Sequence, residues 1–238
     1  MIQLTDLDWI LPQIEVLTQD MPPLYISHRL HDIPDPEERA FKILVSSIIS
    51  LRTKEKATWE VSERLYARIS SLEELLALPI EEMEALLFSC GFYKQKSRQI
   101  KAVCQILKDQ FNGHVPHTID DLLTLPGVGR KVANLVVTEA FEKEGICVDI
   151  HVHRISNRWG IVSTKDPDAT EMALRQILPA KHWRAYNQRL VVFGQNICLP
   201  VKPKCVECFL REQCPSASRI TLKRQLDEEL PKIKSLFE

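Results

Sequence analysis

Helical periodicity is the feature of this sequence that most restricts its fold. Apolar residues recur at intervals of three and four over segments of helical length. One such stripe contains Ile100, Val103, Leu107 and Phe111, and similar segments cover 41–49, 57–69, 80–88 and 130–141. Glycine accounts for only 7 of the 238 residues, and the Asn-Gly pair at 112–113 follows a helical segment instead of joining two alternating strands. We therefore expect an all-α fold.

Composition is that of a globular protein outside the secreted and membrane classes. Hydrophobic residues make up 45% of the chain. No apolar stretch approaches the roughly 20 residues that a membrane span needs, and the first residues lack the basic region of a signal peptide. We expect a cytoplasmic protein whose thiols stay reduced. Proline-rich stretches at 22–23 and 34–36 predict linkers before the first compact unit.

Charge is distributed unevenly, although the formal net charge is only -1. Residues 1–40 contain eight acidic and two basic side chains, whereas residues 94–131 contain seven basic and three acidic ones. A nearly neutral total is therefore compatible with one basic surface that attracts a polyanion. An ordinary surface of mixed charge is the alternative.

Residues 118–141 have the pattern of two short helices joined by a glycine turn. A capping box begins the first helix at Thr118, a proline ends it, and Gly127 and Gly129 then allow a tight turn. The second helix begins at Arg130. Free backbone N–H groups at such a helix start bind phosphate without reading a base sequence. A plain connection between two helices is the alternative.

The seven cysteines fall into two groups. Cys90, Cys104 and Cys147 are scattered in apolar or helical settings, where buried free thiols are expected. The others follow the pattern Cys-x6-Cys-x2-Cys-x5-Cys and are Cys198, Cys205, Cys208 and Cys214. Four thiols in so short a segment of a cytosolic chain indicate a metal site and not disulfides. The thiols alone leave zinc and an iron–sulfur cluster open, because both accept four thiolates.

The string LPGVGRK at 125–131 resembles the helix-hairpin-helix motif of the endonuclease III family of DNA glycosylases. The resemblance extends from about Ile43 to Cys214, and the cysteine spacing matches the [4Fe–4S] loop of that family. It implies two helical domains that flank a DNA-binding cleft. The domains would be a six-helix domain with the hairpin at 33–143, an iron–sulfur cluster domain at 1–32 and 144–214, and a C-terminal tail at 215–238.

Lys131 lies in the first turn of the second hairpin helix, where the helix dipole disfavours a cation. Helical spacing places it on a polar stripe with Asn134, Thr138 and Glu142, pointing away from the core. The resemblance implies that Lys131 is the Schiff-base nucleophile of a bifunctional glycosylase. A helix N-terminus and partial desolvation both favour the neutral amine that such a reaction needs. A lysine that pairs with phosphate is the alternative.

The string CVDIHVHR at 147–154 resembles the family's Val-Asp-x-His-x-x-Arg pattern. This resemblance implies that Asp149 is the essential acid, which stabilises the cationic sugar as the base departs and helps to activate the attacking group. His151 and Arg154 would contact the DNA backbone, as would the hairpin and the cations from Lys94 to Lys101. A helix N-cap is the other role open to Asp149, and the two roles are compatible.

Two positions depart from the family pattern. Relatives commonly have glutamine where this chain has Arg52, and that glutamine fills the gap left by the flipped nucleotide. Phe92 stands where the family usually has a smaller aliphatic wedge, and a core aromatic is its other possible role. Because arginine can stack and donate hydrogen bonds, we expect Arg52 and Phe92 to bind DNA with an altered range of substrates.

The resemblance therefore implies a bifunctional DNA glycosylase and AP lyase of base excision repair. Such an enzyme removes oxidised pyrimidines from duplex DNA and cleaves the strand by β-elimination. We expect a nucleoid-associated monomer with no membrane partner. A mismatch or adenine glycosylase is one alternative, although adenine glycosylases usually lack the lysine and carry an extra C-terminal domain. A non-catalytic DNA-binding module is another, which the presence of Lys131 and Asp149 disfavours and a nicking assay would detect.

Overall fold

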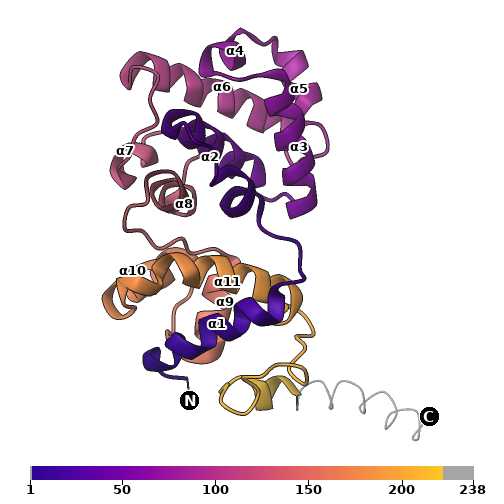
Figure 1. Cartoon of the computed structure of the whole chain (residues 1–238), viewed down its shortest axis with the longest axis vertical. Helices are drawn as coiled ribbons and strands as arrows, with labels where there is room; N and C mark the ends of the chain where they lie inside the picture. Colours follow the sequence, from indigo (N-terminus) through magenta and orange to yellow (C-terminus); the bar gives the residue numbers. More distant parts are fainter. Residues whose placement is uncertain (1, 222–238) are drawn as a thin grey trace, which may run out of the picture. The chain divides into compact units, whose positions relative to one another are not determined.

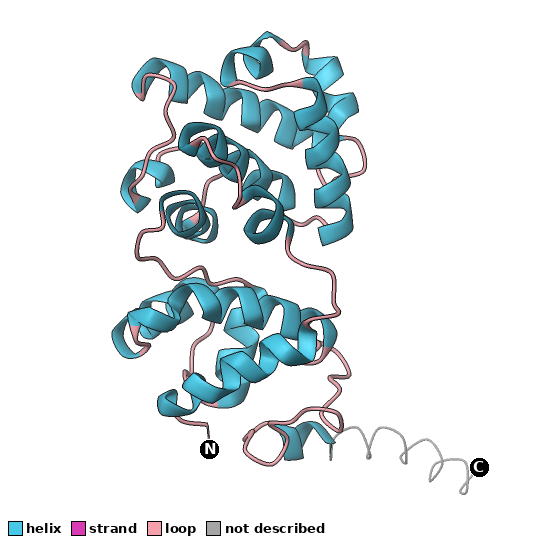
Figure 2. Cartoon of the chain, viewed as in Figure 1, coloured by secondary structure: helices cyan, strands magenta, loops and turns pink. Residues whose placement is uncertain are grey.

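The computed structural model describes residues 2–221, and within this range every regular element is helical (Figure 2). The predicted all-α fold is confirmed. The described residues divide into two compact units, 22–147 and 2–21 together with 148–221. The predicted domain borders were 33 and 143, and the assignment of the hairpin and the cluster to separate functional domains stays a prediction. The predicted tail lies outside the described residues from position 222 onward.

The unit 22–147 is built around one buried helix, α2 (Figure 1). Its elements are a π-helical turn η2 (Ile26–Leu30), α2 (Pro36–Ser50), α3 (Glu55–Arg68), α4 (Leu72–Ala77), α5 (Ile80–Leu87), α6 (Tyr93–Gln110), α7 (Ile119–Leu123) and α8 (Arg130–Phe141). α2 contacts η2, α3, α6 and α8. Ile43, Leu44 and Ile48 of α2 are fully buried. Because neighbouring helices cover α2 on several sides, its sequence is a nearly continuous apolar run.

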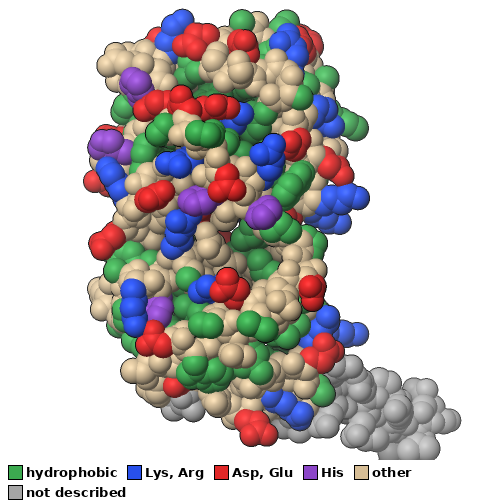
Figure 3. Space-filling model, viewed as in Figure 1, with side chains coloured by type: hydrophobic (Ala, Val, Ile, Leu, Met, Phe, Trp, Pro, Cys, Tyr) green, Lys and Arg blue, Asp and Glu red, His purple; other side chains and the backbone are tan. Residues whose placement is uncertain are grey.

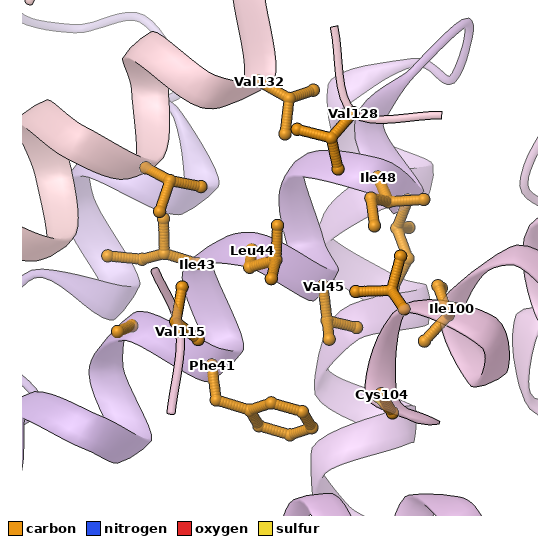
Figure 4. Close-up of a cluster of buried hydrophobic side chains, with 14 of the residues drawn as sticks. Phe41, Ile43, Leu44, Val45, Ile48, Ile100, Cys104, Val115, Val128 and Val132 are labelled. Carbon is orange, nitrogen blue, oxygen red and sulfur yellow. The ribbon is translucent and has the colours of Figure 1, made fainter. Parts of the chain in front are cut away.

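Two valines anchor the glycine turn to this core. Val128 in the turn and Val132 in α8 are buried, and they belong to the same hydrophobic cluster as the α2 residues. Figure 4 shows both side chains on the side of the cluster where Ile48 lies. Gly127 and Gly129, on either side of Val128, are exposed. The turn is therefore held from the inside while its glycine backbone faces solvent.

The stretch at 34–36 begins a helix, so the linker predicted there is wrong. Pro36 is the first residue of α2, and the Asp35 carboxylate accepts hydrogen bonds from the backbone N–H groups of Glu37 and Glu38. Proline suits this position because the first residue of a helix needs no N–H donor and has the φ that the ring imposes. The same residues therefore act as a helix start.

The unit formed by 2–21 and 148–221 packs α11 against both α1 and α9. Its elements are η1 (Leu4–Asp6), α1 (Leu7–Thr18), α9 (Ile150–Trp159), α10 (Pro167–Ile177), η3 (Ala180–His182) and α11 (Trp183–Asn196). Trp159 is buried and meets the rings of Tyr186 and Phe193 from α11. The segment with the four cysteines follows α11. Over the described residues, no helix is long and apolar enough to cross a membrane.

Candidate functional site

The hairpin at 118–141 has the geometry that the sequence predicts. Thr118 accepts a hydrogen bond from Asp121 N at 3.2 Å and begins α7. Gly127 has φ 73°, a conformation that only glycine adopts without strain. Gly129 is the N-cap of α8, and no side chain caps the helix at this position. A Cβ at position 129 would meet nothing within 4 Å, so a ligand can approach the backbone closely there.

Lys131 lies at the partly exposed start of α8, a helix whose middle residues are buried. Lys131 is half-buried, whereas residues 132–140 of α8 are all buried. The polar stripe predicted for this helix is therefore wrong at Asn134 and Thr138. Asn134 donates to Arg130 O at 3.0 Å and accepts from Ile146 N at 3.2 Å, which joins α8 to the segment that follows it. Because the buried helix fixes the main chain of Lys131, it can hold a nucleophilic amine in one place.

Asp149 is the N-cap of α9, as predicted. Its Oδ1 accepts hydrogen bonds from His151 N at 2.8 Å and Val152 N at 2.9 Å. Neither bond uses Oδ2, and the residue is half-buried. One oxygen thus orients the carboxylate and the other is available to a ligand. Asp149 belongs to the unit with α9, whereas Lys131 belongs to the unit with α8.

Arg154 turns toward the protein. Its Nη2 donates to Cys198 O at 2.8 Å and to Gly194 O at 3.0 Å, and it lies 3.1 Å from His151 Nδ1. Gly194 is needed here, because a Cβ at that position would lie 2.6 Å from His151 Nδ1. These contacts join α9 to the end of α11 and favour a structural role for Arg154. Its predicted contact with DNA, like that of His151, stays a prediction.

Arg52 and Phe92 protrude side by side from two different loops of one unit. Arg52 is exposed with φ 52°, and Phe92 is 59% exposed with φ 59°. The Arg52 guanidinium carbon lies 5.7 Å from the centroid of the Phe92 ring, within the range of a cation–π contact. The alternative role of Phe92 as a core aromatic is therefore wrong.

The basic surface predicted on α6 is smaller than the sequence indicated. Lys94 and Arg98 are exposed, but Lys96 is buried. Lys101 donates to the carbonyl oxygens of Leu75, Leu76 and Leu78 at 3.2, 2.8 and 2.5 Å, so it caps the end of α4. Figure 3 likewise shows acidic and basic side chains intermixed on the face in view. Lys96 and Lys101 donate to protein oxygens, whereas Lys94 and Arg98 are the exposed cations of this segment.

The four cysteines near the end of the described chain line one cavity together with Arg158, Lys204 and Arg211. They are free and partly exposed, whereas Cys90, Cys104 and Cys147 are buried as predicted. Burial, with the nearby charges of Cys198 and Cys214, raises the pKa of Cys208 to about 11. Among the described residues, no three His, Cys, Asp or Glu side chains come close enough together to hold a single metal ion.

The donor set around this cavity fits a thiolate-bound group. Arg158 Nη1 lies 3.3 Å from Cys198 Sγ, and a cation there stabilises a thiolate. Arg158 also donates to Leu199 O at 2.7 Å and to Pro200 O at 3.1 Å, which fastens the cysteine segment to α9. A cluster of several irons touches each thiolate at a different atom, so its ligands need not meet at one point.

Sequence reasoning missed Lys96 and Arg158. Lys96 occupies a position on the apolar stripe of α6, four residues before Ile100, and this spacing is a signal that could have identified a buried lysine. Arg158 carries no such signal, because its partners in the cysteine segment lie 40 to 42 residues away in sequence.

Comparison with known proteins agrees with this geometry. A family model described as "HhH-GPD superfamily base excision DNA repair protein" matches residues 45–180. The chain belongs to this family. It is similar to endonuclease III of Thermotoga maritima, with 41% identity over 78% of this chain and 85% of the relative. It is 42% identical to endonuclease III homolog 2 of Arabidopsis thaliana over 78% of this chain and 50% of that protein.

A solved structure with the same fold is that of a trapped endonuclease III–DNA covalent intermediate. Its TM-score to this chain is 0.78, with 30% sequence identity over 92% of this chain and 99% of the other. The similarity spans both units of the described chain.

Proposed function

We propose that this protein, a bifunctional DNA glycosylase and AP lyase of base excision repair, removes oxidised pyrimidines and cleaves the strand through a Schiff base on Lys131. The observation that carries the proposal is the half-buried Lys131 in the first turn of α8, directly after the glycine turn and before the buried residues 132–140. The trapped covalent complex reported for a structural neighbour supports a covalent route. Duplex DNA with damaged bases or abasic sites is the partner, and the nucleoid is the proposed location.

In the proposed reaction, the hairpin anchors one strand by its phosphate while the lesion is extruded. The backbone N–H groups at Gly127 and Gly129 supply the phosphate contacts, and Arg52 and Phe92 occupy the vacated place in the stack. The neutral Lys131 amine attacks C1′ of the sugar, the glycosidic bond breaks, and the base leaves with the bonding electrons. The C1′–O4′ bond of this adduct then opens, O4′ takes up a proton, and an imine forms between C1′ and the lysine nitrogen. The imine acidifies a proton on C2′, and loss of that proton expels the 3′ phosphate.

Asp149 stabilises the positive charge that develops on the sugar in this reaction. The N-cap bonds to Oδ1 hold the carboxylate in one orientation without occupying Oδ2. A positioned carboxylate typically contributes ~10²–10⁴-fold to such a step.

Three variants test the two catalytic roles. Lys131→Ala should release no cleaved strand and form no borohydride adduct, yet still bind lesion DNA, because the glycine amides remain. Asp149→Asn should bind normally while base release slows by ~10²–10⁴-fold. Lys143→Ala is the matched control, because Lys143 is an exposed lysine just beyond α8 and should trap like the wild type. Persistent trapping by Lys131→Ala at saturating enzyme would reduce Lys131 to a phosphate contact.

We further propose that Cys198, Cys205, Cys208 and Cys214 hold a [4Fe–4S] cluster. Support comes from their position around one cavity, from the cation at Cys198, and from membership in a family whose spacing they match. When bound, such a cluster would crosslink the cysteine segment from Cys198 to Cys214, which Arg158 fastens to α9. Because burial raises the pKa of Cys205, Cys208 and Cys214, cluster binding releases protons from these thiols.

Purified protein tests this assignment directly. It should be yellow-brown with broad absorption near ~400 nm and contain iron. Colourless protein with one zinc per chain would contradict the assignment while leaving the reaction at Lys131 unaffected.

A further inference from the structure

Lys96 is a buried lysine whose partners are all neutral oxygens. It is 4% exposed, and its Nζ donates to Ile49 O at 2.7 Å, Leu51 O at 2.6 Å and Thr53 Oγ1 at 2.8 Å. The three acceptors match the three protons of an ammonium group. Burial lowers the pKa of Lys96, so keeping a charged amine here costs free energy. A charged amine retained at this cost indicates that Lys96 has a function.

The three acceptors surround the exposed residue Arg52. Ile49 and Leu51 belong to the C-terminal end of α2, where backbone carbonyls lack partners within the helix and a cation is favourable. Thr53 lies on the other side of Arg52. The bonds from Lys96 therefore clamp the chain immediately before and after Arg52, which itself has the strained φ of 52°.

The same clamp reaches the loop that carries Phe92. Thr53 Oγ1 accepts from Gly91 N at 3.2 Å, and a Cβ at position 91 would lie only 2.6 Å from Arg52 O. The backbone N–H of Lys96 donates to Phe92 O at 3.0 Å. The main chain of Lys96 is thus tied to one loop and its side chain to the other.

We infer that Lys96 is a positioning residue that holds Arg52 and Phe92 together as one rigid pair, so that both enter the DNA stack in a single step. This inference rests on the proposed function, because it specifies how the lesion is extruded. Lys96 itself contacts neither DNA nor the reacting atoms and acts only through the position of Arg52 and Phe92. Its effect is confined to substrates whose damaged base must be unstacked, since an abasic site has no base to extrude.

Lys96→Met tests the inference by removing the ammonium while keeping a side chain of similar length. We expect single-turnover base release from a thymine glycol duplex to fall about 10- to 100-fold, as for other small displacements of positioned groups. The fluorescence change of 2-aminopurine opposite the lesion, which reports stack filling, should shrink. Borohydride trapping at a preformed abasic site should stay near the wild-type level.

A double-mutant cycle with Arg52→Ala separates positioning from general support. If Lys96 acts through Arg52, Lys96→Met should add little to the loss already seen in Arg52→Ala. Losses that add in full, or equal losses on lesion and abasic DNA, would overturn the inference.

A second pair of variants decides the matter if Lys96→Met does not fold. Thr53→Val keeps the shape of the side chain but removes the acceptor, whereas Thr53→Ser keeps the hydroxyl. We expect the lesion-selective loss in Thr53→Val and wild-type behaviour in Thr53→Ser, and equal activity of the two would overturn the inference. Wild-type protein that traps no abasic DNA would instead contradict the proposed function, so the two failures are distinguishable.

Discussion

The hairpin turn and the Arg52–Phe92 pair lie in the same unit and both contain residues with positive φ, but the two regions accommodate this conformation differently. In the hairpin, the positive φ falls on Gly127, which adopts it without steric cost. In the pair, the positive φ values fall on an arginine and a phenylalanine. In the hairpin, glycine avoids the strain. In the Arg52–Phe92 pair, contacts from Lys96, Thr53 and Gly91 hold the strained backbone in place.

This difference separates the roles proposed for the two regions. A phosphate contact needs bare backbone and no side chain, so glycine serves it. A side chain that fills a gap in DNA must be both large and aimed outward, so it cannot be glycine. The surrounding structure then has to supply the conformational restraint.

The largest effect on stability is expected from alanine in the hairpin turn. Gly127→Ala should destabilise the protein by about 1–2 kcal/mol, because alanine is strained at φ 73°. The amide of Gln99 would also have to move. Gly129→Ala is the matched control: its φ is −96° and its surroundings are empty, so stability should not change.

Both glycine variants should nevertheless lose affinity for undamaged duplex, because a methyl group blocks the close approach of phosphate. Thermal denaturation and a binding titration check the two expectations. Full DNA affinity in Gly129→Ala would remove the hairpin backbone from the proposed interface.

A smaller effect on stability is expected at Arg52, where the glycine variant should be more stable than the alanine variant. Relief of the left-handed strain favours Arg52→Gly by about 1–2 kcal/mol over Arg52→Ala, and the greater entropy of unfolded glycine offsets about 0.5–1 kcal/mol of this. Arg52→Gly should therefore be the more stable variant, as measured by chemical denaturation. Both should lose lesion processing to the same extent. A less stable glycine variant would show that Arg52 is not strained.

The smallest effect concerns the salt dependence of DNA binding. Lys94→Ala should reduce the slope of log K against log salt concentration by about 1, because Lys94 is an exposed cation on α6. Lys101→Met should leave the slope unchanged, since Lys101 caps α4 through three carbonyls. A similar change of slope in both variants would contradict the distinction drawn between the two lysines.

Local patterns were sufficient to predict much of the fold and part of the site. The apolar period over 130–141 predicted α8, and the residues after the helical segment at 96–111 predicted its end, where Gly113 N bonds to Leu107 O at 2.8 Å. Asp149 was predicted as an N-cap for the same reason: its partners are two and three residues away.

Contacts between distant residues could not be predicted in this way. Pattern reading assigned polar Asn134 to a solvent-facing stripe, but its amide is buried because Ile146 N supplies a partner across the following turn. Lys96 was counted as surface charge, although carbonyls 45 and 47 residues earlier accept its protons. Arg154 was expected at DNA, which stays a prediction, and its bond to Cys198 O, 44 residues later in the sequence, was not predicted. In each case a polar group is satisfied by a partner that the local sequence does not identify.

Identification of the residue that becomes covalently attached to DNA tests the central claim most directly. Wild-type protein would be reduced with borohydride during turnover on lesion DNA, digested, and its modified peptide sequenced by mass spectrometry. We expect a single modified residue, Lys131, at the start of α8. An adduct on any other residue, or strand cleavage without an adduct, would contradict it.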